Sequence, residues 1–191
     1  MPSGRTHDRI TLWMLPLIVG TCYFITKDGE LTLLCSGAFF FSGLMFGPDL
    51  DIHSVQFKRW GWLRFLWLPY QKLLRHRSWL SHGFIIGTVV RVIYLSLWLF
   101  ILATILLAVS QSIWGFTWNW QTFFSQQFNL IITKYWQEAI AIFIGLELGA
   151  MSHYLSDSIS SYYKRRQKAK SLKPKLKPKV KNASKTRKKP L

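Results

Sequence analysis

The stretch VIYLSLWLFILATILLAVS, residues 92–110, contains no charged side chain. An α-helix rises about 1.5 Å per residue, so this stretch would extend about 28 Å as a helix. The hydrocarbon core of a bilayer is about 30 Å thick. The stretch therefore predicts a membrane-spanning helix and favours an all-α fold.

Three further apolar segments of similar length lie at residues 10–26, 31–47 and 139–155. The first lacks the small-residue cleavage site of a signal peptide, and it leads through the turn KDGE at 27–30 directly into the second. We therefore expect a transmembrane hairpin with a kink at Pro16. The whole chain is predicted to be a polytopic membrane helical bundle with about four transmembrane helices.

The charge of the chain is divided between two unlike regions. The formal net charge is +17, and fourteen of the 25 basic residues but none of the eight acidic ones lie at 164–191. We expect residues 1–163 to form a membrane-embedded helical metal-binding domain and residues 164–191 to form a disordered polybasic tail, which has little apolar surface to bury. Such a tail binds anionic lipid headgroups, or nucleic acid without sequence specificity. No defined protein partner is indicated.

The basic residues also indicate an orientation. Four spans place residues 1–9, the loop 48–81 and everything after Asp157 on one side, and these regions hold 22 of the 25 bases. Basic residues concentrate on the cytoplasmic side of membrane proteins. We therefore expect a multi-pass protein of the cell inner membrane with both termini in the cytoplasm.

Tryptophan supports this arrangement, because the indole ring favours the headgroup level of a membrane. Eight of the ten tryptophans lie in the two long loops between predicted spans. They are Trp60, Trp62, Trp67, Trp79, Trp114, Trp118, Trp120 and Trp136. We expect both loops to contain interfacial helices along the membrane surface rather than separate soluble domains.

Seven histidine and aspartate residues fall at the predicted cytoplasmic ends of the four spans. They are His7, Asp49, Asp51, His76, His82, His153 and Asp157. Neighbouring helices of a bundle lie about 10 Å apart, so side chains at their same-side ends are expected to converge.

The local spacing of these residues predicts how they are presented. His153 and Asp157 are four residues apart, which places them on one face of a helix. An extended segment at 49–51 would point both of its carboxylates the same way. We expect His76 in the loop that leads into the third span and His82 in the first turn of that span.

Imidazole and carboxylate donors without thiolate suit zinc, manganese or iron, and seven candidates exceed the four ligands of a closed zinc site. We therefore expect one or two divalent ions, which could activate a water for hydrolysis. Nearby Arg75 and Arg77 would steer an anionic substrate group. Asp8 is an alternative ligand, and His53 is left outside the set. Singly, such residues are often water-facing histidines and helix-capping aspartates.

Glu147 lies in the middle of the last span, where an ionised carboxylate is costly. We expect it either to pair with Arg91 or to be protonated, while Arg91 could also extend toward the membrane surface. The same span carries a stripe of small residues that favours close helix packing. The stripe consists of Gly145, Gly149, Ser152 and Ser156.

Four blocks of the sequence resemble a bacterial family of uncharacterised metal-binding integral membrane proteins. The blocks are SGRTHDRIT, SGLMFGPDLDIHS, KRWGWLRFLWLPYQKLLRHRSWLSHG and GAMSHYLSDSIS, and the resemblance covers residues 1–165. The order His, Asp-x-Asp, His-x5-His, His-x3-Asp more distantly resembles inner-membrane metal-dependent hydrolases. The resemblance implies a helical membrane protein that holds metal at the seven residues. The hydrolase pattern reads Asp-x-Asp-His, whereas Ile52 precedes His53 here.

Two functional hypotheses follow from these patterns. The first is a metal-dependent hydrolase of phosphoester or lipid-derived substrates, with a cytoplasm-facing His/Asp site. The second is a non-catalytic membrane metal-binding or scaffold protein whose basic tail binds anionic lipid or nucleic acid. A transporter is less well supported, because Glu147 alone lies deep within a span.

Overall fold

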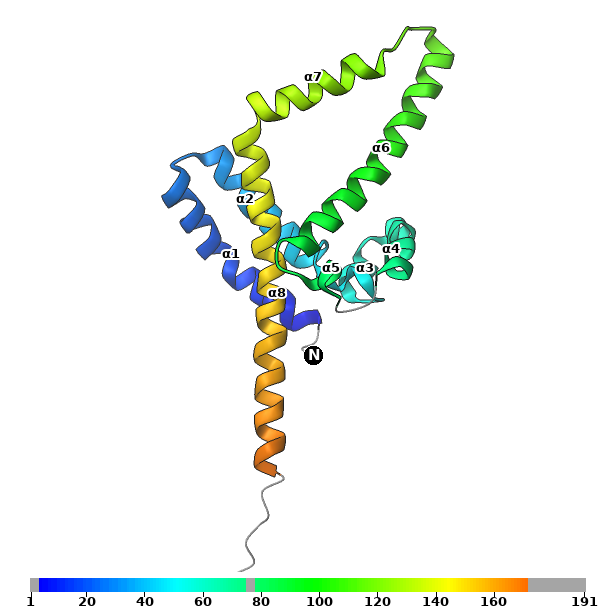
Figure 1. Cartoon of the computed structure of the whole chain (residues 1–191). Coiled ribbons are helices and arrows are strands. Elements are labelled where there is room, and N and C mark those ends of the chain that lie inside the picture. The colour runs from blue at the N-terminus through cyan, green and yellow to red at the C-terminus, as the bar shows by residue number, and fades with distance from the viewer. Residues whose placement is uncertain (1–3, 75–77, 172–191) are drawn as a thin grey trace, which may run out of the picture.

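A computed structural model describes residues 4–74 and 78–171, the last three of them by their backbone alone. Within these ranges every regular element is a helix (Figure 1). The long helices are α1 (Gly4–Thr26), α2 (Gly29–Leu44), α6 (Ile86–Trp114), α7 (Trp120–Thr133) and α8 (Trp136–Ser171). The short ones are η1 (Pro48–Asp51), α3 (Val55–Arg59), η2 (Gly61–Trp67), α4 (Leu68–Leu73) and α5 (Trp79–His82).

Four helical segments are long and apolar enough to cross a membrane, which confirms the predicted all-α class and the number of long apolar helices. They are Gly4–Thr26, Gly29–Asp51, Ile86–Trp114 and Trp136–Lys168. Each is longer than the apolar run that predicted it.

Helices α1 and α2 form the predicted hairpin. Asp28 ends the turn between them, and its carboxylate accepts a hydrogen bond of 2.9 Å from the backbone N–H of Leu31, which caps the start of α2. Close to the other end of the pair, a Cβ added at Gly43 would lie 2.5 Å from the Thr11 side chain. The two helices are therefore in close contact along their length.

Helices α2 and α8 form the most extensive contact in the described structure. A Cβ at Gly145 would collide with the backbone carbonyl of Cys35, and one at Gly149 would lie 2.7 Å from the carbonyl oxygen of Phe39. Ser42 adds a hydrogen bond of 2.6 Å to the Leu146 carbonyl. The predicted stripe of small residues thus allows two helix backbones to touch.

The loop after α2 folds into a small cap with its own apolar core. Trp67 is 0% exposed, and Tyr70 is also buried. They pack against Phe46 and Leu50 in the main cluster of buried apolar residues. The loop fits the predicted interfacial segment only in part. Trp62 remains 80% exposed as expected, whereas Trp67 and Tyr70 are buried.

Helix α6 diverges from the other long helices, and α7 leads back from its far end to the start of α8 (Figure 1). The buried residues of α6 are Gly87, Thr88 and Arg91, all in its first two turns. Val90, Val92, Tyr94 and Leu95 are partly buried against the apolar core of the cap, and most apolar side chains of α6 beyond them are exposed.

Helix α8 continues to Ser171, so residues 164–171 are helical although the sequence predicted a disordered tail from 164 onward. The remainder of that predicted tail, 172–191, lies outside the described residues.

Candidate metal centre

Three predicted ligands from the two ends of the chain come together beside α8. His7 projects from α1, and its Nε2 atom lies 3.4 Å from Asp157 Oδ1. The ring of His153 stacks on the ring of His7, with centroids 3.8 Å apart and planes inclined by 14°. The four-residue spacing on α8 places His153 and Asp157 toward the same neighbour, as expected. His7, His153 and Asp157 are called triad A below.

Three more predicted ligands meet on the other side of the cluster. His82 lies between two carboxylates, with Nδ1 at 3.5 Å from Asp51 Oδ2 and Nε2 at 3.8 Å from Asp49 Oδ1. Asp49, Asp51 and His82 are called triad B.

Two expectations about the backbone of triad B were wrong. Residues 48–51 form the 3₁₀-helix η1 rather than an extended segment, because Pro48 favours the helical φ at its first turn. His82 ends the separate short helix α5 rather than beginning the third span, which starts at Ile86.

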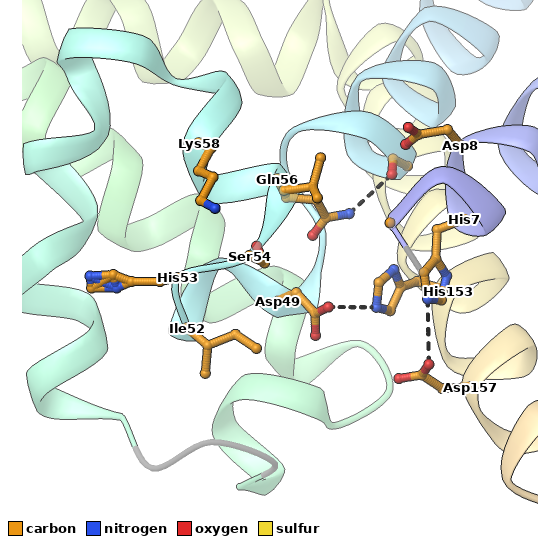
Figure 2. Close-up of a pocket in the computed structure, with 13 residues that line it drawn as sticks. His7, Asp8, Asp49, Ile52, His53, Ser54, Gln56, Lys58, His153 and Asp157 are labelled. Atoms are coloured by element: carbon orange, nitrogen blue, oxygen red, sulfur yellow. Dashed lines mark hydrogen bonds and ion pairs between the residues drawn. The ribbon is translucent and has the colours of Figure 1, made fainter. Parts of the chain in front are cut away.

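Asp49 joins the two triads. Its Oδ1 faces His82, while its Oδ2 lies 3.2 Å from Nε2 of His153 (Figure 2). A single carboxylate therefore contacts an imidazole of each triad.

The donor atoms are arranged as ligands of a cation would be. Two ligands about 2.1 Å from one ion lie about 3.0 to 3.4 Å apart in octahedral or tetrahedral geometry. The contacts between donors here span 3.2 to 3.8 Å, mostly longer than hydrogen bonds. Either of the two triads has three donor atoms within 4.8 Å of one another. The imidazole and carboxylate donors fit a divalent transition metal.

Unsatisfied polar atoms support the same interpretation. His153 is 4% exposed, yet its Nδ1 makes no hydrogen bond within the described structure, and its Nε2 has the ion-pair contact of 3.2 Å with Asp49. Oδ1 of Asp49 and Oδ1 of Asp157 also make no hydrogen bond there and face histidine nitrogens at 3.8 and 3.4 Å. Buried polar atoms almost always have a partner, and leaving them without one costs about 1 to 3 kcal/mol each. A cation between them would supply the missing partner.

Serine hydroxyls hold two of the histidines. Ser156 lies about one turn after His153, directly before Asp157, and approaches Nδ1 of His7 at 2.6 Å. Ser81 donates a hydrogen bond to Asp51 and lies 3.0 Å from Nδ1 of His82. In each case the hydroxyl occupies Nδ1 and leaves Nε2 directed at a carboxylate, which is how metal-binding histidines are commonly oriented.

Arg91 is linked to triad B through Ser81, a role that the sequence did not reveal. Its side chain is 0% exposed rather than extended to the membrane surface, and its guanidinium donates to the Ser81 carbonyl at 3.1 Å and to Thr88 Oγ1 at 2.9 Å. Burial raises the pKa of nearby Tyr70 to about 12, so that hydroxyl stays neutral and does not offset the charge of Arg91.

Glu147 does not pair with Arg91 in the described structure, contrary to one of the two expectations. Its carboxylate instead accepts a hydrogen bond of 3.0 Å from the backbone N–H of Ile85. Ile85 has a φ of 63°, an uncommon value for a β-branched residue. Glu147 thus fixes the sharp bend between α5 and α6.

The remaining candidates lie outside the cluster. Asp8 forms an ion pair with Arg59, at 2.9 Å for one of its two contacts, so the alternative ligand beside His7 has another partner. His53 is exposed and points away from the triads (Figure 2). The predicted ligand His76 and the predicted steering residues Arg75 and Arg77 lie outside the described residues.

A pocket of about 260 Å³ opens onto the cluster. All three residues of triad A line the pocket, and they come from the two terminal helices. Asp49 lines it as well, and Lys58 and Gln56 form its other wall. Sequence reasoning did not single out Lys58, although it begins the basic run that was assigned to the membrane surface. The pocket leaves space for a water or a small anionic group beside the donors.

Comparison with known proteins relates the chain to a family defined by metal binding. A family model described as "Uncharacterized metal-binding protein (DUF2227)" matches residues 2–167. A protein of Aquifex aeolicus (strain VF5), described as an uncharacterized protein, is 43% identical over 60 residues. That match covers 31% of this chain and 38% of the relative. No solved structure gives a significant match.

Proposed function

The chain belongs to this family of uncharacterised metal-binding proteins, and we propose that it is an inner-membrane, metal-dependent hydrolase of phosphoester or lipid-derived substrates. The observation that carries the proposal is the convergence of six His and Asp side chains, including the buried His153, whose Nε2 faces Asp49 and whose Nδ1 makes no hydrogen bond in the described structure. These donors come from both terminal helices and from the segments between them.

Membrane insertion is supported by the outward-facing surface of the long helices. Helix α6 has 29 residues and would extend about 43 Å, enough to cross a hydrocarbon core of about 30 Å. Large apolar side chains such as Leu97, Leu102 and Ile105 are more than half exposed. Contiguous apolar surface of this extent is rare on monomers in water and is what lipid tails would cover.

A cytoplasmic site is supported by the distribution of charge. The triads lie at the end of the helices that is bordered by Arg5, Arg9, Lys58 and Arg59, whereas Lys27 lies at the opposite end of the hairpin. The positive-inside tendency favours the basic end in the cytoplasm. The substrate pocket would then open at the inner surface of the membrane.

Hydrolysis is supported by the chemistry of the pocket. A divalent ion with an open coordination position supplies a nucleophilic water near neutral pH and polarises a phosphoryl oxygen. His153 and Asp157 would hold the ion, with Ser156 orienting His7. Lys58 lies on the opposite wall of the pocket and can neutralise an anionic group of the substrate.

Detergent-purified protein tests both parts of this proposal. The wild-type chain should bind at least one Zn or Mn ion and hydrolyse bis(4-nitrophenyl) phosphate or a dispersed phospholipid. His153→Ala should lower metal affinity and turnover by more than about 100-fold, because it removes a direct ligand. His53→Ala is the matched control for metal binding, because its ring points away from the triads, and it should leave metal affinity unchanged.

Two results would contradict the proposal in different ways. Unchanged metal content in His153→Ala would remove the site. Metal bound without turnover of either substrate would leave a non-catalytic metal-binding or scaffold protein.

A further inference from the structure

We propose that the cluster holds two divalent ions and that Asp49 bridges them, with one carboxylate oxygen bound to each ion. This inference rests on the metal binding proposed above, but it does not depend on hydrolysis. One ion would be held by triad A with Asp49 Oδ2, and the other by triad B, in which Asp49 contributes Oδ1.

The orientation of Asp49 is the first support. Its two oxygens face different imidazoles, since Oδ2 lies 3.2 Å from His153 Nε2 and Oδ1 lies 3.8 Å from His82 Nε2. A carboxylate that binds one ion presents one oxygen, or both together, toward one point. A carboxylate whose oxygens face donors on opposite sides is placed to bridge two ions.

The separation of the donors is the second support. Ligands of a single ion lie within about 4.4 Å of one another, twice the length of a metal–ligand bond of about 2.2 Å. The three donor atoms of each triad lie within 4.8 Å of one another, close to this limit, whereas the six donors do not form one group at that distance. A single ion therefore cannot use all six side chains in this arrangement.

The contacts of His82 are the third support. Its Nδ1 lies 3.0 Å from Ser81 Oγ, whereas its Nε2 lies 3.8 Å from Asp49 Oδ1, longer than a hydrogen bond. An ion bound at Nε2 would therefore be shared with Asp49 Oδ1, the oxygen that faces away from His153.

Charge also favours two ions for the proposed class of substrate. The cluster contains three carboxylates, Asp49, Asp51 and Asp157, and its histidines must be neutral to bind metal. One divalent ion would leave these groups with a net charge of about −1, whereas two would give about +1. A net positive site can accept an anionic phosphoryl group, and paired ions about 3.5 to 4 Å apart are common in phosphoester hydrolases.

Titration of the purified full chain with Mn(II) tests the number and coupling of the ions. We expect two Mn(II) ions per chain and an exchange-coupled electron paramagnetic resonance spectrum, which requires neighbouring ions. Saturation at one ion per chain with the isolated six-line spectrum of Mn(II) would overturn the proposal. This measurement uses the wild-type protein and so does not depend on a variant folding.

Variants assign the ions to the triads. His82→Ala should retain one ion in triad A, and His7→Ala should retain one ion in triad B, each with an uncoupled spectrum. Asp49→Asn should weaken both ions and abolish the coupling, since a neutral amide does not bridge. Loss of both ions in His82→Ala, with unchanged circular dichroism and thermal unfolding, would contradict separate sites. His53→Ala and Asp8→Asn are the matched controls and should retain two coupled ions.

The outcomes also separate this inference from the proposed function. Two coupled ions without turnover would support the bridged site and reject the hydrolase. One ion with turnover would reject the bridge and support the hydrolase. No bound ion would reject both.

Discussion

Helices α6 and α8 are both long and apolar, yet they differ in how they pack. Half of the residues in the apolar window of α8 are buried, whereas none in that of α6 is. Gly145 and Gly149 let the backbone of α8 touch α2, while the middle of α6 carries large side chains such as Leu102 and Phe100.

For the membrane insertion proposed above, this difference implies that apolar content alone would not bring two helices together. Lipid tails are as apolar as leucine, so a helix gains little by exchanging lipid for another apolar surface. Close contact of backbones and interhelical hydrogen bonds, such as that from Ser42 to the Leu146 carbonyl, provide the gain. Two candidate ligands of triad A, His153 and Asp157, lie on α8, the helix that has such a partner.

The largest effect should come from filling the contact between α2 and α8. Gly145→Leu would force a side chain into the backbone of α2 at Cys35. We expect the free energy of unfolding to fall by more than about 4 kcal/mol and metal binding to be lost. Thermal unfolding in detergent and metal analysis measure both. Gly37→Leu is the control, because nothing lies within 4 Å of a Cβ there, and a comparable loss in that variant would contradict the explanation.

A matched pair of phenylalanines compares the two helices directly. Phe39 on α2 is 0% exposed and Phe100 on α6 is 45% exposed. Phe39→Ala should reduce the free energy of unfolding by about 3 kcal/mol, because it leaves a cavity, whereas Phe100→Ala should change it by less than about 0.5 kcal/mol. Denaturant or thermal titration in one detergent provides the measurement. Equal losses would mean that α6 has a packed face as well.

The smallest of the three effects should come from the base of α6, where Arg91 is fully buried. Arg91→Met removes the donor to the Ser81 carbonyl, and through Ser81 it loosens Asp51 and His82. We expect metal affinity to fall about 10- to 100-fold, as for other residues that orient ligands.

Unfolding should change little in Arg91→Met, because an apolar side chain of similar length replaces a buried charge. Isothermal titration with Zn(II) measures the affinity, and Lys134→Met is the control at the far end of the molecule. An unchanged affinity would show that Arg91 serves packing alone.

The features that follow from helix periodicity could be predicted from the sequence. Gly145 and Gly149 are one turn apart, so their shared face is readable from spacing. The convergence of His7 and His153 follows from counting apolar segments, since four spans return both residues to the same side.

Other features depend on contacts that spacing does not encode. The segment around Trp67 and Tyr70 has the aromatic and basic composition that is typical of a segment at a membrane surface. Its two rings are buried because the cap packs on Phe46, a tertiary contact that composition does not predict. The charge of Arg91 suggests exposure, but a tertiary partner, the Ser81 carbonyl, holds it inside. Composition alone also predicted disorder from Lys164 onward, whereas α8 continues as a helix to Ser171.

The contact between His7 and Ser156 also bears on biosynthesis. These residues are separated by 149 positions in the chain. At about 5 to 20 residues per second, a ribosome needs roughly 7 to 30 s to reach Ser156 after synthesising His7. Nascent α1 and α2 can form their hairpin during that interval, but triad A does not exist until the last long helix has been made. The proposed metal loading of triad A would therefore be a late step, and a chain that stops before α8 leaves His7 without Ser156.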